Sequence, residues 1–197
     1  MREAGIGRVL VASLHQGIAD ILPTRLGFYE NWLNAEGLRD GTIGLAPLYA
    51  VLSFLRQEGD GYTLVTTRAG HYAAEWTVQS MRRWERAAVK RAPSWVRKRL
   101  ALRLVRRLVH ECCDGNRAQS RLRRGTATID LRASIFCTVR EPVGYALCGF
   151  YAAAFKTLLA EFDVPSDTRV VECRGAGAST CVLAINLSPT ESAARPA

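Results

Sequence analysis

The fold depends on residues 148–181, CGFYAAAFKTLLAEFDVPSDTRVVECRGAGASTC. The stretch opens with Cys148 and continues as an apolar run with helical spacing to Phe162. Two short segments rich in β-branched residues follow, with a glycine-rich connection between them. This pattern predicts a helix followed by a hairpin. Cys148, Cys173 and Cys181 can then meet only if the helix packs back on the hairpin.

Length and composition predict one domain over residues 1–187, followed by a flexible tail at 188–197. The chain has 197 residues, of which 48% are hydrophobic, enough to bury a sizeable core. No run of about 18 uncharged apolar residues occurs, so no membrane span is expected. The N-terminus has no signal-peptide profile. We therefore expect a cytoplasmic protein whose six cysteines stay reduced.

Spacing patterns indicate an α+β fold. Helical spacing of apolar residues predicts helices, ahead of the central stretch, over residues 8–22, 23–37, 45–56, 69–90 and 96–109. Residues 62–67 alternate in the way that is typical of a short strand, and residues 126–139 read as extended structure. The order predicts an antiparallel sheet backed by helices.

The positive charge is concentrated in residues 82–124, which we call the basic segment. Fifteen Lys or Arg stand there against three acids, a net charge of +12 in a chain whose total is +9. Arg99, Arg103 and Arg107 lie on the outer face of a predicted amphipathic helix, a candidate surface for an anionic partner. A solvated basic face is the other interpretation. Nucleic acid is not expected, because no helix-turn-helix glycine turn or base-stacking motif accompanies the charge.

Three motifs together resemble the 4-vinyl-reductase domain family. They are Arg140-Glu141-Pro142, Cys148-Gly149-Phe150-Tyr151, and Glu172-Cys173-Arg174-Gly175-Ala176-Gly177 followed by Cys181. The likeness is most specific over residues 125–185. It implies a fold shared with TRAPP vesicle-tethering subunits, a pocket for a hydrophobic small molecule, and a homodimer. Similar proteins include the sensor domains of aromatic-responsive bacterial regulators and an accessory protein of bacteriochlorophyll synthesis.

Cys148, Cys173 and Cys181 are candidate zinc ligands, because thiolates suit the tetrahedral coordination of this metal. The spacing of the last two is not that of a zinc-finger knuckle. The alternative is three buried, reduced thiols that pack as small apolar groups.

A fourth ligand is not evident. The resemblance implies a Glu three residues before the middle cysteine, but Val170 stands there and the acid is Glu172. One step along a strand turns a side chain to the opposite face, so Glu172 cannot simply substitute. The candidates are Glu172 through a bend, His110, Cys137 or water.

Aromatic residues gather in the N-terminal half of the chain. Five of them are candidates for the walls of a ligand pocket: Phe28, Trp32, Tyr49, Tyr72 and Trp76. The last two are four residues apart and therefore share one side of a helix. Ordinary packing in the core is the alternative for each.

The predicted function is binding of a hydrophobic or aromatic ligand, such as a pigment precursor or hydrocarbon, by a carrier, accessory or sensor domain. A second hypothesis, which the resemblance suggests, is an accessory enzyme of vinyl reduction on a tetrapyrrole of the bacteriochlorophyll type. A reductase needs a hydride donor, and the sequence has no dinucleotide fingerprint or catalytic constellation. Binding of an anionic partner through the basic segment is the third hypothesis.

Overall fold

The structure is a computed structural model that describes residues 6–33, 44–112, 118–132 and 134–187. Its helices, in chain order, are α1 (Arg8–Ile21), α2 (Leu26–Glu30), α4 (Leu45–Gln57), α5 (Asp60–Ser80), α6 (Arg83–Arg91), α7 (Ser94–Cys112) and α8 (Gly149–Glu161). Its strands are β1 (Ala118–Arg123), β2 (Thr126–Leu131), β3 (Asp167–Glu172) and β4 (Val182–Asn186). Three 3₁₀ turns join them: η1 (Pro23–Arg25), η2 (Ile135–Cys137) and η3 (Arg174–Ala176). The fold is α+β, as predicted, with one antiparallel sheet in the order β1-β2-β4-β3.

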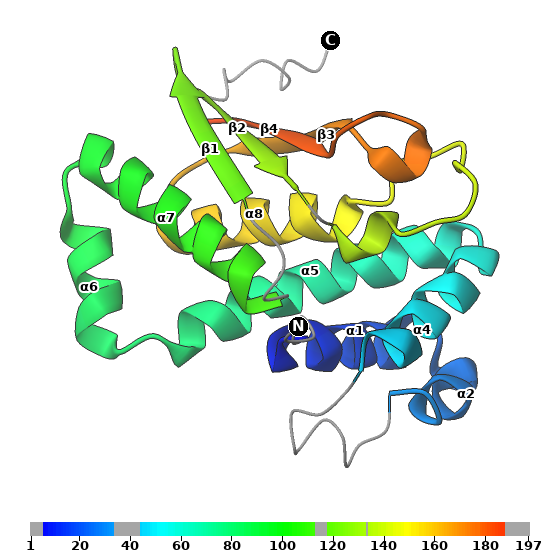
Figure 1. Cartoon of the computed structure of the whole chain (residues 1–197). Helices are drawn as coiled ribbons and strands as arrows, with labels where there is room; N and C mark the ends of the chain where they lie inside the picture. The colour runs from blue at the N-terminus through cyan, green and yellow to red at the C-terminus, as the bar shows by residue number, and fades with distance from the viewer. Residues whose placement is uncertain (1–5, 34–43, 113–117, 133, 188–197) are drawn as a thin grey trace, which may run out of the picture.

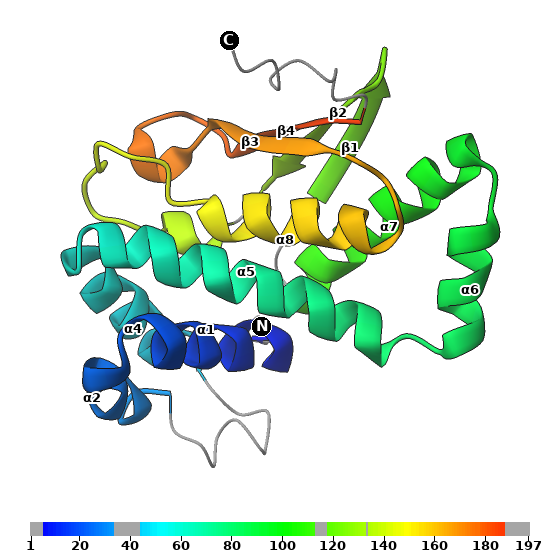
Figure 2. The ribbon, with the colours of Figure 1, turned by 180° about the vertical axis from the view of Figure 1, so that it is seen from behind.

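The elements lie in layers (Figure 1). Helix α8 runs beneath the sheet, α5 runs beneath α8, and α1 and α4 lie on the far side of α5. The view from behind shows the same order, with α6 and α7 at one end (Figure 2). We call α1, α5 and α8 the helix stack. No described helix is both long and apolar enough to cross a membrane.

Glycines let the backbones of the helix stack approach closely. A Cβ at Gly70 of α5 would lie 2.4 Å from the carbonyl oxygen of Phe150 on α8. A Cβ at Gly17 of α1 would lie 2.8 Å from the carbonyl oxygen of Val65 on α5. A backbone atom cannot move aside as a flexible side chain can, so any larger residue would push the helices apart.

The central strands of the sheet follow the expected two-residue period. Ile129 of β2 lies opposite Leu183 of β4, and both are buried, as are their neighbours two residues along each strand. β1 joins β2 through a tight turn at Arg124 and Gly125, which both have positive φ. The sequence did not predict β1 because its side chains are exposed or half-buried, which leaves no apolar alternation.

The predicted strand at residues 62–67 is wrong, since these residues belong to α5. Tyr62, Val65, Thr66 and Ala69 are buried at helical spacing, whereas Leu64 is 55% exposed. The Thr66 hydroxyl donates to the Tyr62 carbonyl oxygen at 2.8 Å, a bond typical of threonine inside a helix. Packing against α1 and α8 therefore outweighs the strand preference of the threonines and valine.

The predicted helix over residues 69–90 is two helices. Met81 and Arg82 are extended, and α6 restarts with the Arg82 N–H donating to the Glu85 carboxylate at 3.2 Å. The predicted helix over 23–37 begins with η1 and continues as α2, and residues 34–37 lie outside the described part. So do residues 188–197.

The predicted extended segment 126–139 ends early. β2 stops at Leu131, and residues 135–137 form η2 instead. This turn brings Phe136 and Cys137 to the start of α8.

Candidate metal centre

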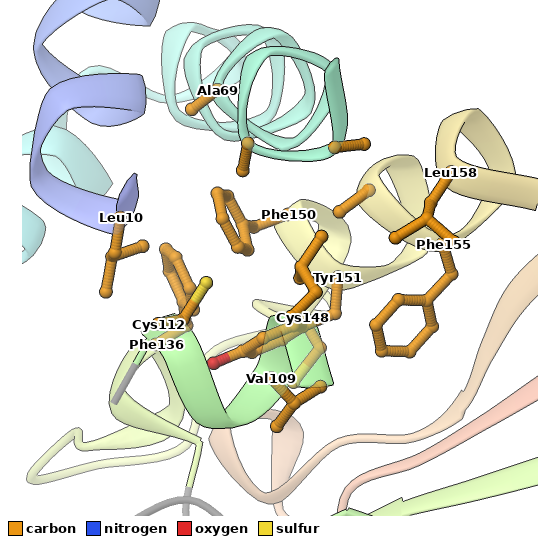
Figure 3. Packing of buried hydrophobic residues seen from close by; sticks show 14 of the residues in the cluster. Leu10, Ala69, Val109, Cys112, Phe136, Cys148, Phe150, Tyr151, Phe155 and Leu158 are labelled. Carbon is orange, nitrogen blue, oxygen red and sulfur yellow. The ribbon is translucent and has the colours of Figure 1, made fainter. Parts of the chain in front are cut away.

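The start of α8 rests on an aromatic core. Phe150 is fully buried, stacks on Phe136 with ring centroids 4.9 Å apart, and meets Tyr151 edge-on at 5.2 Å. Figure 3 shows these rings beside Cys148, with Leu10, Ala69 and Val109 reaching the same interior from other helices. The predicted helix from Cys148 to Phe162 is confirmed: Cys148 is its N-cap and Phe162 its C-cap. Burial of this end places the Cys148 thiol in the interior.

Four cysteine sulfurs meet at this place, and we call them the thiol centre: Cys137, Cys148, Cys173 and Cys181. All four Sγ atoms lie within 4.8 Å of one another. The Cys137 Sγ is 3.1 Å from that of Cys148, 3.4 Å from that of Cys173 and 3.5 Å from that of Cys181. The predicted convergence of Cys148, Cys173 and Cys181 is therefore confirmed, and all four thiols are free.

Each cysteine comes from a different element. Cys137 ends η2, Cys148 caps α8, Cys173 lies between β3 and η3, and Cys181 directly precedes β4. The connection between the last two is bent back by Gly177, whose φ of 95° favours glycine. A Cβ at Gly175 would lie 2.5 Å from the side chain of Leu147, the neighbour of Cys148, which would then have to shift. The glycines of the motif thus let η3 close over the start of α8.

Backbone N–H groups support negative charge on two of the sulfurs. The N–H of Leu147 donates to the Cys173 Sγ at 3.2 Å, and that of Arg174 donates to the Cys181 Sγ at 3.4 Å. Hydrogen bonding with Cys148 lowers the pKa of the Cys173 thiol to about 6. Hydrogen bonding with Cys137 lowers the pKa of Cys181, whereas it raises that of Cys148. Cys148, Cys173 and Cys181 thus differ in how readily they release a proton, and thiolates this close repel one another unless a cation lies among them.

This arrangement can bind a metal. Four sulfurs at about 2.3 Å from a central tetrahedral ion are about 3.8 Å apart. Four of the sulfur pairs in the thiol centre are 3.1 to 4.0 Å apart, which brackets that spacing. Three of the four sulfurs belong to buried residues, and Cys137 is half-buried.

The fourth sulfur is that of Cys137, one of the four candidates that the sequence left open. Glu172 is exposed and accepts a hydrogen bond from the Thr180 hydroxyl, and His110 is exposed on α7. Neither belongs to the group of ligand atoms. β3 has a register irregularity between Val170 and Glu172, but it does not bring the Glu172 carboxylate to the thiol centre.

The five aromatic pocket candidates lie in three places. Phe28 and Trp32 are 44% and 40% exposed and contact Phe54, with centroids 5.1 and 5.7 Å from it. Tyr72 and Trp76 stack on the outer side of α5, where the Tyr72 hydroxyl donates to Asp20 at 2.6 Å. These two pairs line none of the described hollows.

Tyr49 lines an open hollow of about 740 Å³ between α4 and residues 138–145. We call it the α4 groove. Its far wall begins at the residue after Cys137, so it lies next to the thiol centre.

The three arginines of the anionic-partner face are all exposed on α7. Arg103 and Arg107 line a shallow hollow of about 490 Å³ against β1, with Arg106, His110 and Arg132. Arg99 instead lies over the Trp95 ring, 5.7 Å from its centroid. Sequence spacing on α7 could not include Arg132, because that residue follows β2.

Comparison with known proteins does not assign the chain to a family. No protein-family model matches it, and no curated protein matches it significantly. The interpretation of the site therefore depends on the geometry of the thiol centre.

Proposed function

We propose that this chain is a small-molecule-binding domain whose fold is closed by a tetrathiolate zinc centre. The observation that carries the proposal is the convergence of four free cysteine sulfurs within 4.8 Å. Zinc is the metal that sets of four thiolates most often hold in proteins.

The zinc has a structural role in this proposal. Four protein ligands complete a tetrahedron and leave no position for water or substrate, whereas catalytic zinc keeps one position open. The sulfurs belong to four separate elements, so one ion would join η2, α8, β3 and β4. Metal binding and folding are then linked.

The ligand set also bears on the resemblance to the 4-vinyl-reductase domain family. That family's zinc sites carry a Glu where this chain has Val170. Cys137 offers a fourth anionic ligand from η2, so the loss of the glutamate is balanced by a thiolate gained elsewhere. On this reading the chain is a member with an altered ligand set.

The α4 groove is the proposed place for a hydrophobic or aromatic ligand. Its volume is in the range of small-molecule sites, and Tyr49, Tyr145, Val139 and Val143 supply apolar surface. Such a domain acts as a carrier, accessory or sensor for the ligand, and we expect it to be a homodimer in the cytoplasm. Light scattering of the purified protein measures the oligomeric state.

Metal analysis tests the zinc centre. We expect about one zinc per chain, and cobalt substitution should give the visible absorption of a tetrahedral cobalt–thiolate site. Cys137→Ser distinguishes this site from one with three thiolates and water, because it should reduce metal content or affinity as much as Cys148→Ser does. A metal-free protein, or full metal content in Cys137→Ser, contradicts the four-thiolate centre.

Mass spectrometry of ligands extracted from the natively produced protein tests the binding function. We expect an aromatic or polycyclic compound at close to one per chain. Protein with no extractable small molecule, and no binding of aromatic probes, contradicts the proposal.

Binding of an anionic partner is a second candidate function. The observation that favours it is the convergence of Arg103, Arg106, Arg107 and Arg132 on one hollow. Within the described part of the chain, only Arg107 of these has an ion-pair partner, Glu111 at 2.6 Å. Exposed charges contribute little to stability, so reversing Arg99, Arg103 and Arg107 to Glu should leave the melting temperature nearly unchanged. Retention on heparin should fall and depend steeply on salt. Reversal of Lys156 and Arg169, exposed on other elements, is the control. Equal retention of both variants contradicts this function.

A further inference from the structure

The lining of the α4 groove includes an arginine with one buried nitrogen that has no hydrogen-bond partner among the described residues. Arg56 is half-buried on α4, and its Nη1 atom is buried with no hydrogen-bond acceptor among the described residues. A buried donor of this kind costs free energy in proportion to its lost hydration, and more when it belongs to a charged group. Buried polar atoms of charged groups are ordinarily paired, so the position favours an anionic oxygen.

The other charged residues in the lining of the α4 groove do not disfavour the binding of an anion. Arg140 adds a second positive charge, and Glu141 is the one acid in the lining. Glu141 is exposed and has no ion pair with either arginine among the described residues. An anion that enters the groove therefore meets two guanidinium groups, of which Arg56 lies deeper.

Two phenol rings line the same groove. Tyr49 comes from α4 and Tyr145 from the opposite wall. Tyr145 packs edge-on against the buried Tyr62, with centroids 5.9 Å apart, and the Tyr62 hydroxyl donates to the Leu147 carbonyl oxygen at 2.9 Å. Burial raises the pKa of Tyr62, and the nearby Arg56 charge acts in the opposite direction. An aromatic body between the rings would place an acid group within reach of Arg56.

The wall that carries Tyr145 is held at both ends. Residues 138–145 run from Cys137 to the approach of Cys148, so both flanks of the segment end in the thiol centre. Its middle is fastened by the Val143 N–H, which donates to the Gly175 carbonyl oxygen at 2.8 Å. A wall fixed at three points can hold a ligand at low entropic cost.

We propose that the α4 groove binds an aromatic or polycyclic carboxylic acid, with the carboxylate on Arg56 and the ring system between Tyr49 and Tyr145. The inference rests on the proposed function, that this domain binds a small molecule, and adds the chemical class of the ligand. The planar guanidinium fork suits a carboxylate, and a neutral hydrocarbon leaves Arg56 unpaired.

Matched acid and amide probes test the proposal on the full-length protein. 1-Naphthoate and 1-pyrenebutyrate are titrated at neutral pH against 1-naphthamide and 1-pyrenebutanamide, which have the same rings and no charge. At least one acid should bind about tenfold or more tightly than its amide, the effect of one charge-assisted hydrogen bond. Arg56→Gln should abolish the difference, and Arg56→Lys should retain part of it because the charge remains.

Two controls distinguish the site from general charge effects. Arg169→Gln removes an exposed arginine from β3 that is not part of the groove lining, and should leave the affinity for both probe series unchanged. Thermal melts of each variant without probe verify that Arg56→Gln is folded. Equal affinity for acids and amides, or acid binding that survives Arg56→Gln, overturns the anion site and leaves small-molecule binding standing. Binding of neither series overturns both.

Discussion

The thiol centre and the helix stack hold the molecule together in different ways. In the helix stack, Gly17 and Gly70 let long regular elements touch backbone to backbone, and the contact area is apolar. In the thiol centre, short turns and element ends bring four ionisable sulfurs together. The first arrangement is stable by packing alone, whereas the second brings together groups that repel one another when they ionise. The difference predicts that one region folds by close packing, and that the other gains its stability from the proposed zinc ion.

Removal of the metal should have the largest effect on stability, and it should act on the thiol centre and not on the helix stack. Treatment of the zinc protein with a strong chelator is expected to lower the melting temperature substantially, because the binding free energy of structural zinc contributes to folding. Hydrogen exchange should accelerate at the amides of Leu147 and Arg174, which donate to sulfur, more than in α5. Cys112→Ala is the control, since Cys112 is buried outside the thiol centre and its loss should leave metal content unchanged. Uniform acceleration along the whole chain would mean that the two regions are not separable.

Phe150→Ala tests the aromatic core that joins the two regions. The side chain is fully buried against Phe136, so the substitution should cost about 3–5 kcal/mol in the free energy of unfolding. Phe28→Ala, which removes a ring that is 44% exposed, should cost clearly less. Urea titrations of both variants give the comparison, and equal losses would contradict the proposed core.

Gly70→Ala tests the close packing of the helix stack. One methyl group would stand 2.4 Å from the Phe150 carbonyl oxygen, so α5 and α8 must separate, at a cost of about 1–3 kcal/mol. Gly27→Ala in α2 is the matched control, because nothing lies within 4 Å of its Cβ position. There the better helix propensity of alanine should leave stability unchanged or raise it by up to about 1 kcal/mol. A Gly70→Ala protein as stable as the wild type would refute the backbone contact.

The smallest expected effect is a pH dependence of folding stability that arises from His71 in the helix stack. Its Nδ1 lies 2.6 Å from the Thr157 hydroxyl, and burial lowers its pKa below the usual 6.5. The unfolded chain then takes up the proton first as the pH falls, so this contribution to stability is present above about pH 6.5 and is lost below it. Denaturant melts at pH 5.5 and 7.5 should show a smaller difference for His71→Gln than for the wild type. An identical difference in both proteins would exclude His71 as its source.

Local signals in the sequence predicted much of the fold around the site. The apolar run after Cys148 is a helix, the break after Phe162 is a turn with Asp163 at positive φ, and the last two strands pair as a hairpin. These features depend on residues close together in the chain, where helix period, turn residues and β-branched side chains act directly. The strand predicted at residues 62–67 is wrong because contacts with distant segments, rather than local signals, decide the structure there. Its apolar pattern fits both the period of a helix and that of a strand. Only the burial of one side against α1 and α8 selects the helix.

What the sequence by itself determined is the α+β class, the α8–hairpin unit and the convergence of Cys148, Cys173 and Cys181. The membership of Cys137 was decided by the tertiary structure, as was the exclusion of Glu172. Cys137 meets Cys181 across 44 residues of chain, and it does so because Phe136 beside it packs on Phe150 and turns η2 inward. The placement of Arg56 and Tyr145 along one groove is likewise a product of tertiary structure. Contacts of this kind join segments far apart in sequence, and their free energy comes from burial that no local pattern records.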